Sequence, residues 1–529
     1  MLVVITKVLL SVFVLYACLH VAPAEGKRLV CYYPNWAQYR PELGKYWVEN
    51  IDPFSCTHLI FAFAQLSGTS VVAYEANDDQ NPWMWRAMTS LRNSNPNLRT
   101  LLAIGGYTHG TKRFSDLSAS PSSRAQFIKD VIILLRYWRF DGLDLDWEYP
   151  ADDMPEDREN LSVLIKELRL AFDKEASIYN NERLLLAAAV PAGIERVRKG
   201  YDLRSIDPYI DFYNVMTYDY HGLWENTTNA ASPTNAPDGD PLCLTATLNY
   251  YLENGASREK INVGLSLFGR SWTLSRSGDT AIGSPAIAGG AAGPYTLTPG
   301  ILSYYEVCTL LKNGYTARFD PLAQVMYAFR GNQWVTYESR VTLELKVDYI
   351  LENGFGGAMV WSLDHDDFLG RFCNQGSYPL ISYISSRVIN APNSVASSTT
   401  MASTSTATST VTSTTTTTAS TSTASTSTAS TSTASPSTTS TATSIQPTSS
   451  TTTTDVPADG GEFRCPASEG KHPDTNNPDC STYYVCMRHV PRRLSCPVLR
   501  SASTKRWSQL LFSASTKRCV ESNNGQCPV

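Results

Sequence analysis

The sequence contains 529 residues, of which 42% are hydrophobic and 11% aromatic, and it carries a formal net charge of −5. A chain of this length exceeds one small domain, and its apolar content excludes a wholly disordered protein. The mild acidity argues against nucleic acid as a partner, because phosphate binding needs a basic surface.

The N-terminus carries the pattern of a secretory signal peptide over residues 1–24. Lys7 precedes an apolar run, Val8–Leu19, and Ala22-Pro23-Ala24 supplies an A-x-A cleavage site. A membrane anchor is the alternative, but the run is shorter than the ~20 residues that span a bilayer. No later segment has a continuous apolar run of spanning length. We therefore expect a secreted, extracellular protein that does not associate with a membrane.

Short apolar runs recur through a predicted large domain at residues 25–387, with helical patterns such as Arg124–Tyr137 and Asn160–Lys174 between them. Most runs are continuously apolar, which is typical of parallel strands covered on both faces. The predicted strands are Leu29–Tyr33, His58–Phe63, Leu101–Gly105, Gly142–Asp146, Leu184–Ala189, Tyr213–Thr217, Asn262–Leu267 and Ala358–Ser362. This alternation predicts an α/β fold, a (β/α)8 TIM barrel with a small α+β insertion at about 269–340. An open doubly wound sheet is the alternative, but no glycine fingerprint follows the first strand.

The segment Asp141–Glu148 carries three acids on one face of a predicted strand. Because side chains alternate along a strand, Asp144, Asp146 and Glu148 point one way, and Leu143, Leu145 and Trp147 point the other. Repulsion and desolvation raise the pKa of at least one acid, which suits a general acid near neutral pH. A solvated acidic loop and a metal site are the alternatives. A loop would not keep the apolar alternation, and no further metal ligands stand out, so we expect a catalytic site without a metal.

These residues and several separated motifs resemble the secreted animal chitinases of glycoside hydrolase family 18. The family signature D-G-x-D-x-D-W-E is complete at Asp141–Glu148. Further matching segments are Cys31–Arg40, Leu101–Gly106, Met216–Asp219, Phe268–Ser271 and Gly356–Ser362. The resemblance extends through nearly all of residues 28–373. It implies a monomeric endochitinase that binds chitin and chitin oligosaccharides, cleaves their β-1,4 linkages with retention and needs no cofactor.

The resemblance also assigns roles to the acids. Glu148 protonates the glycosidic oxygen while the N-acetyl oxygen of the substrate attacks the anomeric carbon. Asp146 orients the acetamido group, and Asp144 exchanges a proton with Asp146. The residues alone leave the nucleophile unassigned, because Asp146 and Glu148 lie on one strand whereas most glycosidases use a second carboxylate across the sugar.

The other site residues implied by the resemblance surround this strand. Tyr218 and Asp219 complete the catalytic set. The substrate-binding set is Tyr32, Trp36, Phe63, Gly105, Gly106, Tyr107, Trp147, Met216, Trp224, Arg270 and Trp361. Core packing is the alternative for each aromatic residue. Tyr107 stands where many active relatives carry tryptophan, so we expect a smaller sugar platform there. His109 in the same loop is either an ordinary loop residue or a substrate contact.

Cysteines and sequons fit an oxidising, secretory compartment. The resemblance implies the disulfides Cys31–Cys56 and Cys308–Cys373 and leaves Cys243 as a small, buried, unpaired residue. Asn160 and Asn226 begin N-x-S/T sequons and are therefore glycosylation candidates. A glycan on Asn226 would lie near the cleft if Trp224 lines it.

A Ser/Thr-rich linker is predicted at residues 388–461. Residues 388–454 contain no charged residue, and such a stretch cannot bury enough apolar area to fold. Its composition is typical of a mucin-like, O-glycosylated stalk, and a bare flexible tether is the alternative. Either would separate two folded units.

The last 68 residues, 462–529, contain six cysteines and are expected to form a small disulfide-rich β module. Cys480–Cys486 resembles the peritrophin-type chitin-binding domain, and Tyr483, Tyr484 and Phe512 match its sugar-stacking positions. The family pattern would pair Cys496 with Cys519, although the repeated segment SASTKR lengthens the gap between them. A cysteine-rich module without sugar preference is the alternative.

Two other classes of function compete with a chitinase. One is a non-catalytic lectin on the same fold, a group that typically loses the acid found here at Glu148. The other is a structural protein of a chitinous matrix that acts through its C-terminal module.

Overall fold

The computed structural model describes residues 26–80, 83–237 and 239–391, together with the backbone of short strands between Gly470 and Val520. The chain divides into two compact units, Met1–Ser398 and Thr399–Val529, and each is described by itself. The predicted signal peptide and residues 392–461 of the predicted linker lie outside the described residues. The predicted start of the linker at residue 388 is too early, because Val388 is the buried last residue of the helix Pro379–Val388.

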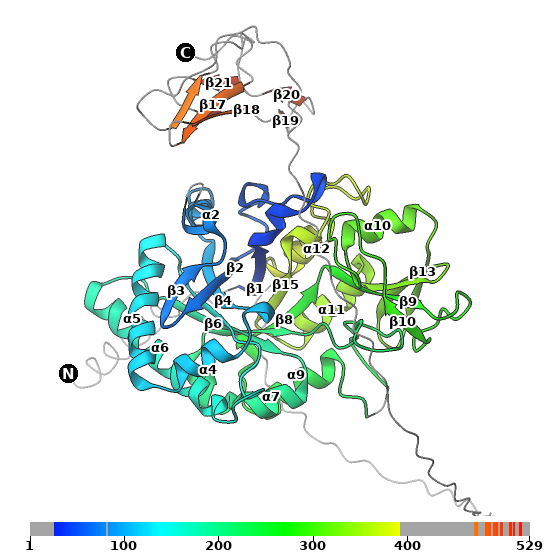
Figure 1. Ribbon diagram of the computed structural model, residues 1–529, viewed down its shortest axis with the longest axis horizontal. Coiled ribbons are helices and arrows are strands. Elements are labelled where there is room, and N and C mark those ends of the chain that lie inside the picture. The colour runs from blue at the N-terminus through cyan, green and yellow to red at the C-terminus, as the bar shows by residue number, and fades with distance from the viewer. Residues whose placement is uncertain are drawn as a thin grey trace, which may run out of the picture. The chain divides into compact units, whose positions relative to one another are not determined.

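Eight parallel strands of the first unit form a closed barrel, as predicted (Figure 1). They are β1 (Arg28–Pro34), β2 (His58–Ser67), β4 (Arg99–Gly105), β5 (Gly142–Asp146), β6 (Leu185–Pro191), β7 (Phe212–Met216), β8 (Ile261–Ser266) and β15 (Gly357–Trp361). β1 pairs with both β15 and β2, and this double pairing closes the sheet. The short strand β3 (Ser70–Ala73) runs antiparallel to the end of β2.

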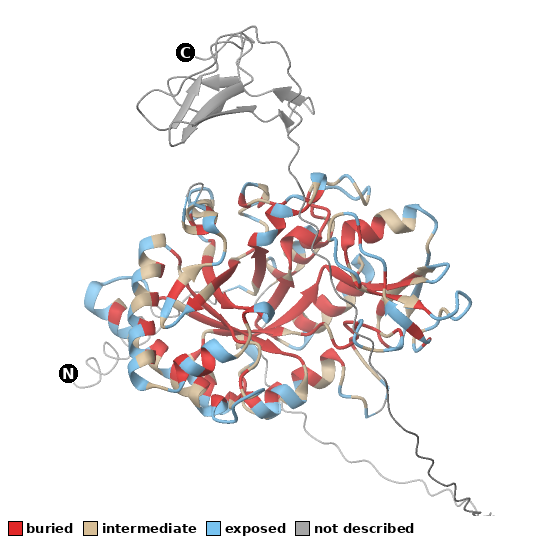
Figure 2. Ribbon diagram, in the orientation of Figure 1, coloured by how far each residue is buried: buried red, intermediate tan, exposed pale blue. Residues whose placement is uncertain are grey.

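Helices cover the outside of the barrel, and their inner faces join the buried strands in one apolar layer (Figure 2). They are α3 (Met84–Ser90), α4 (Lys112–Ser118), α5 (Pro121–Trp138), α6 (Asp157–Tyr179), α7 (Ile194–Gly200), α8 (Leu203–Ile206), α9 (Leu244–Glu253), α11 (Arg340–Glu352) and α12 (Pro379–Val388). The single-turn helix α2 (Ala76–Asp79) buries only Asp78 and takes no part in this layer. The sequence at both ends of α5 explains where this helix begins and ends. Ser120 caps its first turn, Pro121 occupies the first helical position, and the left-handed Arg139 ends it.

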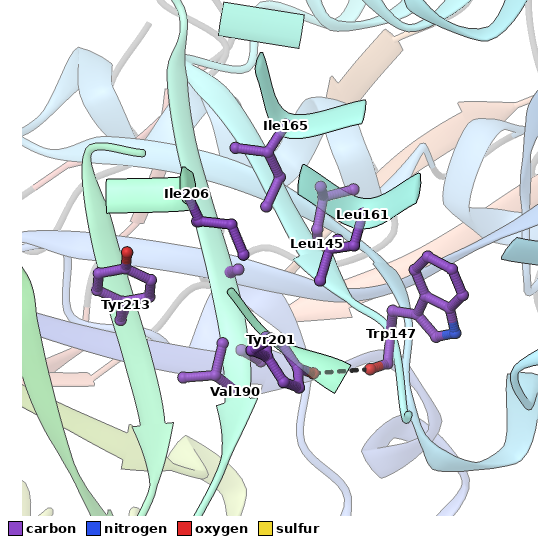
Figure 3. Close-up of a pocket in the computed structure, with 10 residues that line it drawn as sticks. Leu145, Trp147, Leu161, Ile165, Val190, Tyr201, Ile206 and Tyr213 are labelled. Atoms are coloured by element: carbon purple, nitrogen blue, oxygen red, sulfur yellow. Dashed lines mark hydrogen bonds between the residues drawn. The ribbon is translucent and has the colours of Figure 1, made fainter. Parts of the chain in front are cut away.

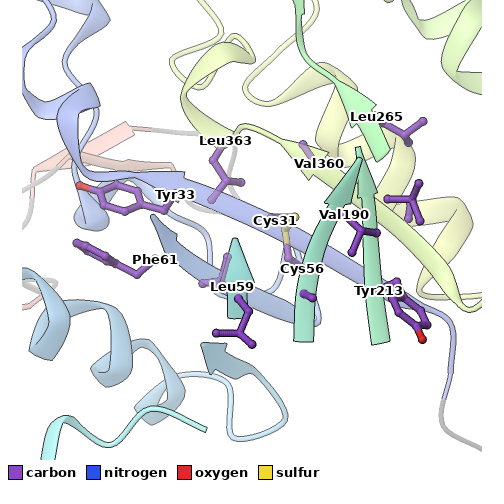
Figure 4. Close-up of a cluster of buried hydrophobic side chains, with 14 of the residues drawn as sticks. Cys31, Tyr33, Cys56, Leu59, Phe61, Val190, Tyr213, Leu265, Val360 and Leu363 are labelled. Carbon is purple, nitrogen blue, oxygen red and sulfur yellow. A yellow bond between two sulfur atoms is a disulfide. The ribbon is translucent and has the colours of Figure 1, made fainter. Parts of the chain in front are cut away.

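The connection between β1 and β2 contains only short 3-10 turns, the first of which is Asn35–Tyr39. A disulfide between Cys31 and Cys56 ties β1 to the segment just before β2. Figure 4 shows this disulfide among buried side chains that include Leu59, Phe61 and Val360. The covalent link and its apolar surroundings therefore fix the base of a loop that reaches over the carboxyl end of the barrel.

The predicted insertion forms a second, antiparallel sheet between β8 and α11. Its strands are β9 (Phe268–Leu274), β10 (Ala286–Gly289), β11 (Ile301–Ser303), β12 (Thr316–Asp320), β13 (Val325–Arg330) and β14 (Gln333–Tyr337), accompanied by α10 (Tyr304–Lys312). Trp272 and Trp334 pack edge to face in its core, with ring centroids 5.5 Å apart. Cys308 on α10 is bonded to Cys373, which is the pairing that the resemblance implied. Cys243 is unpaired and buried.

The second unit is described only as strands β16 (Gly470–Pro473), β17 (Thr482–Met487), β18 (Val490–Ser495), β19 (Val498–Arg500), β20 (Trp507–Gln509), β21 (Leu511–Ser513) and β22 (Arg518–Val520). Tyr483 and Tyr484 belong to β17, and Phe512 to β21. Cys496 and the side chains of this unit, including that of Cys519, lie outside the described residues. In the part of the chain that is described, no helix is both long and apolar enough to cross a bilayer.

Candidate active site

The three predicted acids follow β5 along the barrel interior and become more accessible toward its carboxyl end. Asp144 is fully buried, Asp146 is 3% exposed, and Glu148 is half-buried just beyond the strand. Tyr32 on β1 donates a 2.8 Å hydrogen bond to Oδ2 of Asp144, and the amide of Asn214 on β7 donates to Oδ1 at 3.2 Å. Of the three acids, Glu148 is therefore the most accessible to a molecule that arrives from solvent.

Burial raises the pKa values of all three acids. It raises the pKa of Asp144 to about 7, although the hydrogen bonds from Tyr32 and Asn214 oppose the shift. Burial and then the charges of Glu148 and Asp144 raise the pKa of Asp146 well above its ordinary value. For Glu148, burial raises the pKa to about 6. Such a group holds a proton in mildly acidic solution and can release it, as general acid catalysis requires.

Two glycines bring β4 against β5 beside the acids. The amide of Gly106 donates a 2.8 Å hydrogen bond to the carbonyl of Asp146. A Cβ atom at Gly105, whose φ is +118°, would lie 2.0 Å from that same carbonyl oxygen. Any side chain at Gly105 would thus push the two strand ends apart. The following residue, Tyr107, is 78% exposed and donates its backbone amide to Glu148.

A second group of predicted residues follows β7. Tyr218 is buried and contacts the sulfur of Met359 through its hydroxyl at 3.7 Å. Asp219 forms a two-point ion pair with Arg270 of β9, at 2.7 and 2.5 Å. Met216 is half-buried at the end of β7. The insertion thus supplies the cation that neutralises Asp219.

Predicted aromatic residues form a cluster at the carboxyl ends of β1, β2 and β15. The ring of Phe63 stacks on those of Trp36 and Trp361, with centroids 6.0 Å apart in both pairs. Tyr32 contacts Trp361 at 5.3 Å. Trp36 remains 40% exposed, so one face of the cluster is open to solvent. Aromatic rings of this kind suit the apolar faces of sugars.

Trp224 continues the aromatic surface on the insertion side. It is 56% exposed, and the guanidinium of Arg270 lies 5.3 Å from its ring centroid. Asn226, two residues further on, is exposed, which fits its prediction as a glycosylation candidate. Asn160, the other candidate, is half-buried in the first turn of α6.

The substrate-binding role predicted for Trp147 is wrong, because this side chain points away from the barrel interior. It is 2% exposed, stacks on Phe114 at 5.2 Å and donates its indole N–H to Thr111. Strand alternation places it opposite the acids. Figure 3 shows it beside a small apolar space between β5, β6 and α6, where Tyr201 donates a hydrogen bond to its backbone carbonyl.

His109 serves as part of the loop structure. It is buried, its Nε2 accepts from the amide of Leu66 at 3.1 Å, and its Nδ1 lies 3.1 Å from the carbonyl of Gly110. Both ring nitrogens are therefore occupied within the protein.

Three residues at the site were not predicted from the sequence. Asn214 holds Asp144 and also donates to the hydroxyl of Tyr32 at 3.0 Å. Tyr149 forms a hydrogen bond with Glu148, and the guanidinium of Arg196 lies 4.1 Å from the ring centroid of Tyr149. Residues next to a signature can be suspected from proximity, as Tyr149 could, but Asn214 and Arg196 reach the site through pairing of distant segments.

Comparison with known proteins agrees with this geometry. The model of the glycosyl hydrolases family 18 matches residues 28–366. Mouse chitotriosidase-1 is 42% identical over 364 residues, which cover 68% of this chain and 77% of the relative. The active chitinase from Trichuris suis superposes with a TM-score of 0.66 at 37% identity, covering 68% and 99% of the two chains. Human YKL-39, described as a pseudo-chitinase with retained chitooligosaccharide binding, has a TM-score of 0.65 at 39% identity, covering 68% and 99%.

Proposed function

Because the chain belongs to family 18 of the glycosyl hydrolases, we propose that it is a secreted endochitinase that hydrolyses β-1,4 linkages between N-acetylglucosamine residues. The observation that carries this proposal is the complete row of acids on β5, with a half-buried Glu148 whose pKa is raised to about 6. A lectin needs a cleft but has no need of a protonated acid at its centre.

In the proposed reaction the glycosidic oxygen takes the proton of Glu148 as its bond to the anomeric carbon breaks. The carbonyl oxygen of the neighbouring acetamido group forms the new bond to that carbon. Water then opens the resulting oxazolinium ring, gives its proton to Glu148 and restores the acetamido group. The anomeric configuration is retained, because the carbon is inverted twice.

The geometry supports an internal nucleophile. Asp219, which follows β7, is the carboxylate outside β5 whose charge raises the pKa of Glu148. Arg270 binds both of its oxygens, so neither is free to attack the sugar. Family 18 is an established exception to the two-carboxylate rule of glycosidases, so this step follows from family membership as well as from the site. Asp146, whose pKa is raised well above its ordinary value by burial and then by the charges of Glu148 and Asp144, would donate a hydrogen bond to the acetamido group when it carries its proton.

Product analysis on chitin oligomers of defined length tests the proposal. We expect the parent to release products whose new reducing ends are in the β configuration, detected by NMR before mutarotation, and to leave fully deacetylated oligomers uncut. Glu148→Gln should lower the rate at least 1,000-fold while oligomer binding is kept. Inverted products, or equal cleavage of deacetylated oligomers, would overturn the mechanism.

A chitin-binding lectin is the second candidate function, and the similarity to YKL-39 is the observation that favours it. An inactive parent that binds chitooligosaccharides as tightly as Glu148→Gln would support the lectin. We further propose that the Ser/Thr-rich segment tethers the barrel to a C-terminal chitin-binding module and so raises its local concentration at an insoluble surface.

A further inference from the structure

An arginine that no sequence motif singled out stands beside the general acid. Arg196 lies on α7, the short helix that follows β6, and its side chain is exposed. Its guanidinium carbon is 4.1 Å from the ring centroid of Tyr149, within cation–π distance. Tyr149 follows Glu148 directly and forms a hydrogen bond with its carboxylate.

The charge of Arg196 has no other evident partner. Among the described residues it forms no ion pair with a carboxylate, whereas Arg198 on the same helix pairs with Glu195. An exposed arginine normally finds an acid or remains in solvent. Here the planar group covers an aromatic ring that in turn contacts the proton donor.

The charges around Glu148 come from several elements. Asp144 and Asp146 on β5 and Asp219 after β7 are acidic. Tyr149, Tyr201 and Tyr218 are neutral hydroxyls nearby. The backbone amide of Tyr107 donates to the carboxylate. Among the described residues, the charge of Arg196 lowers the pKa of Glu148, whereas Arg270 is paired with Asp219. Arg196 thus opposes burial and the neighbouring acids, which all favour the protonated carboxyl.

We propose that Arg196 is a positioning residue for the general acid: stacked on Tyr149, it fixes the hydrogen bond to Glu148 and limits the pH range over which Glu148 keeps its proton. The inference rests on the proposed function of Glu148. The direction in which loss of the Arg196 charge should shift the protonation of Glu148 is definite. A nearby positive charge stabilises the carboxylate, so removal of that charge lets Glu148 remain protonated at higher pH.

The experiment compares pH profiles of kcat/KM on a short chitooligosaccharide, which report the ionisation of the free enzyme. For Arg196→Gln we expect the alkaline limb to move to higher pH. One pH unit above the parent's alkaline midpoint, the variant should retain about twice the parent's fraction of its maximal activity. Arg196→Lys keeps the charge and should restore most of the parent profile. Arg198→Gln makes the same charge change on the same helix, and its alkaline limb should coincide with that of the parent.

A second readout does not depend on turnover. The Glu148 carboxyl carbon is followed by NMR in protein labelled at glutamate side chains, and the signal is assigned by its loss in Glu148→Gln. We expect a higher titration midpoint in Arg196→Gln than in the parent. Equal midpoints in the two proteins overturn the inference. A parent that cleaves no oligomer overturns the proposed function instead, and the titration still decides the role of Arg196.

Discussion

The hydroxyl of Tyr32 donates a 2.8 Å hydrogen bond to Asp144 across the barrel interior, from a strand that is not adjacent to β5. Both side chains are fully buried or nearly so. This bond fixes the innermost acid and opposes the rise in its pKa that burial causes. The ionisation of Asp144 therefore depends on β1 as well as on its own strand.

Tyr32→Phe should lower kcat/KM on chitooligosaccharides about tenfold, as expected for loss of one hydrogen bond to a charged group. Steady-state kinetics across pH measure the effect. Tyr33→Phe is the matched control, because the Tyr33 hydroxyl is buried and finds no hydrogen-bond partner among the described residues. Equal losses in both variants would attribute the effect to packing.

Asp78 makes barrel stability depend on pH. It is fully buried, accepts hydrogen bonds from Asn35 at 2.8 Å and from the amide of Glu75 at 2.9 Å, and has a pKa that burial raises to about 7. A raised folded-state pKa means that its contribution to stability is complete below about pH 4 and is lost as pH rises through about 7.

Asp78→Asn cannot ionise, so it should lose less stability than the parent when pH rises from about 4 to about 8. The free energy of unfolding should change by about 2–4 kcal/mol in favour of the variant over that window, as measured by denaturant titration. Asp116→Asn, at a site with a 65% exposed side chain, is the control and should follow the parent. A constant difference between Asp78→Asn and the parent would contradict the prediction.

Lys346 and Glu338 form a buried ion pair behind the loop that carries Tyr218 and Asp219. Both side chains are almost completely excluded from solvent. Lys346 also donates to Ser232 Oγ at 2.8 Å, and Ser232 donates to the carbonyl of Thr217 at 2.8 Å. Removal of one charge would leave the other buried without a partner.

Lys346→Met should therefore destabilise the protein by about 3–5 kcal/mol, and the double variant Lys346→Met with Glu338→Leu should recover most of that loss. Thermal or denaturant unfolding of the three proteins gives the comparison. A double variant as unstable as the single one would show that the cost lies in packing around the site.

Deletion of residues 392–529 separates the two proposed units and keeps the whole of α12, including the buried Val388. The truncated protein should keep nearly parental kcat/KM on soluble oligomers and lose activity mainly on crystalline chitin, because only the insoluble substrate benefits from a tether. Assays on both substrates with equal molar enzyme test this. Loss of activity on soluble oligomers would refute the division into independent units.

The sequence predicted the barrel well because its strands are locally encoded. β5 spans Gly142–Asp146, as expected, since a glycine and alternating leucines within the signature Asp141–Glu148 mark its limits. β2 extends beyond the predicted end at Phe63 to Ser67, because it continues outside the barrel to pair with β3. That pairing was not visible in the pattern of the isolated run.

The sequence predicted those residues of the site that lie within recognisable motifs. The strand period alone put Trp147 opposite the acids, and the resemblance assigned it to the cleft against that evidence. Asn214 and Arg196 were missed because β7 and α7 reach the acids only after the sheet has closed. Such residues carry no local mark of their function.

The first strand of the small antiparallel sheet, β9, follows barrel strand β8 almost directly. β8 ends at Ser266 and β9 begins at Phe268, so a single residue separates the two elements. β14 returns at Tyr337 and α11 starts at Arg340. Because neither connection is long enough to act as a hinge, we expect the small sheet and the barrel to move as one rigid body. Arg270 of β9 would then keep a fixed position relative to Asp219.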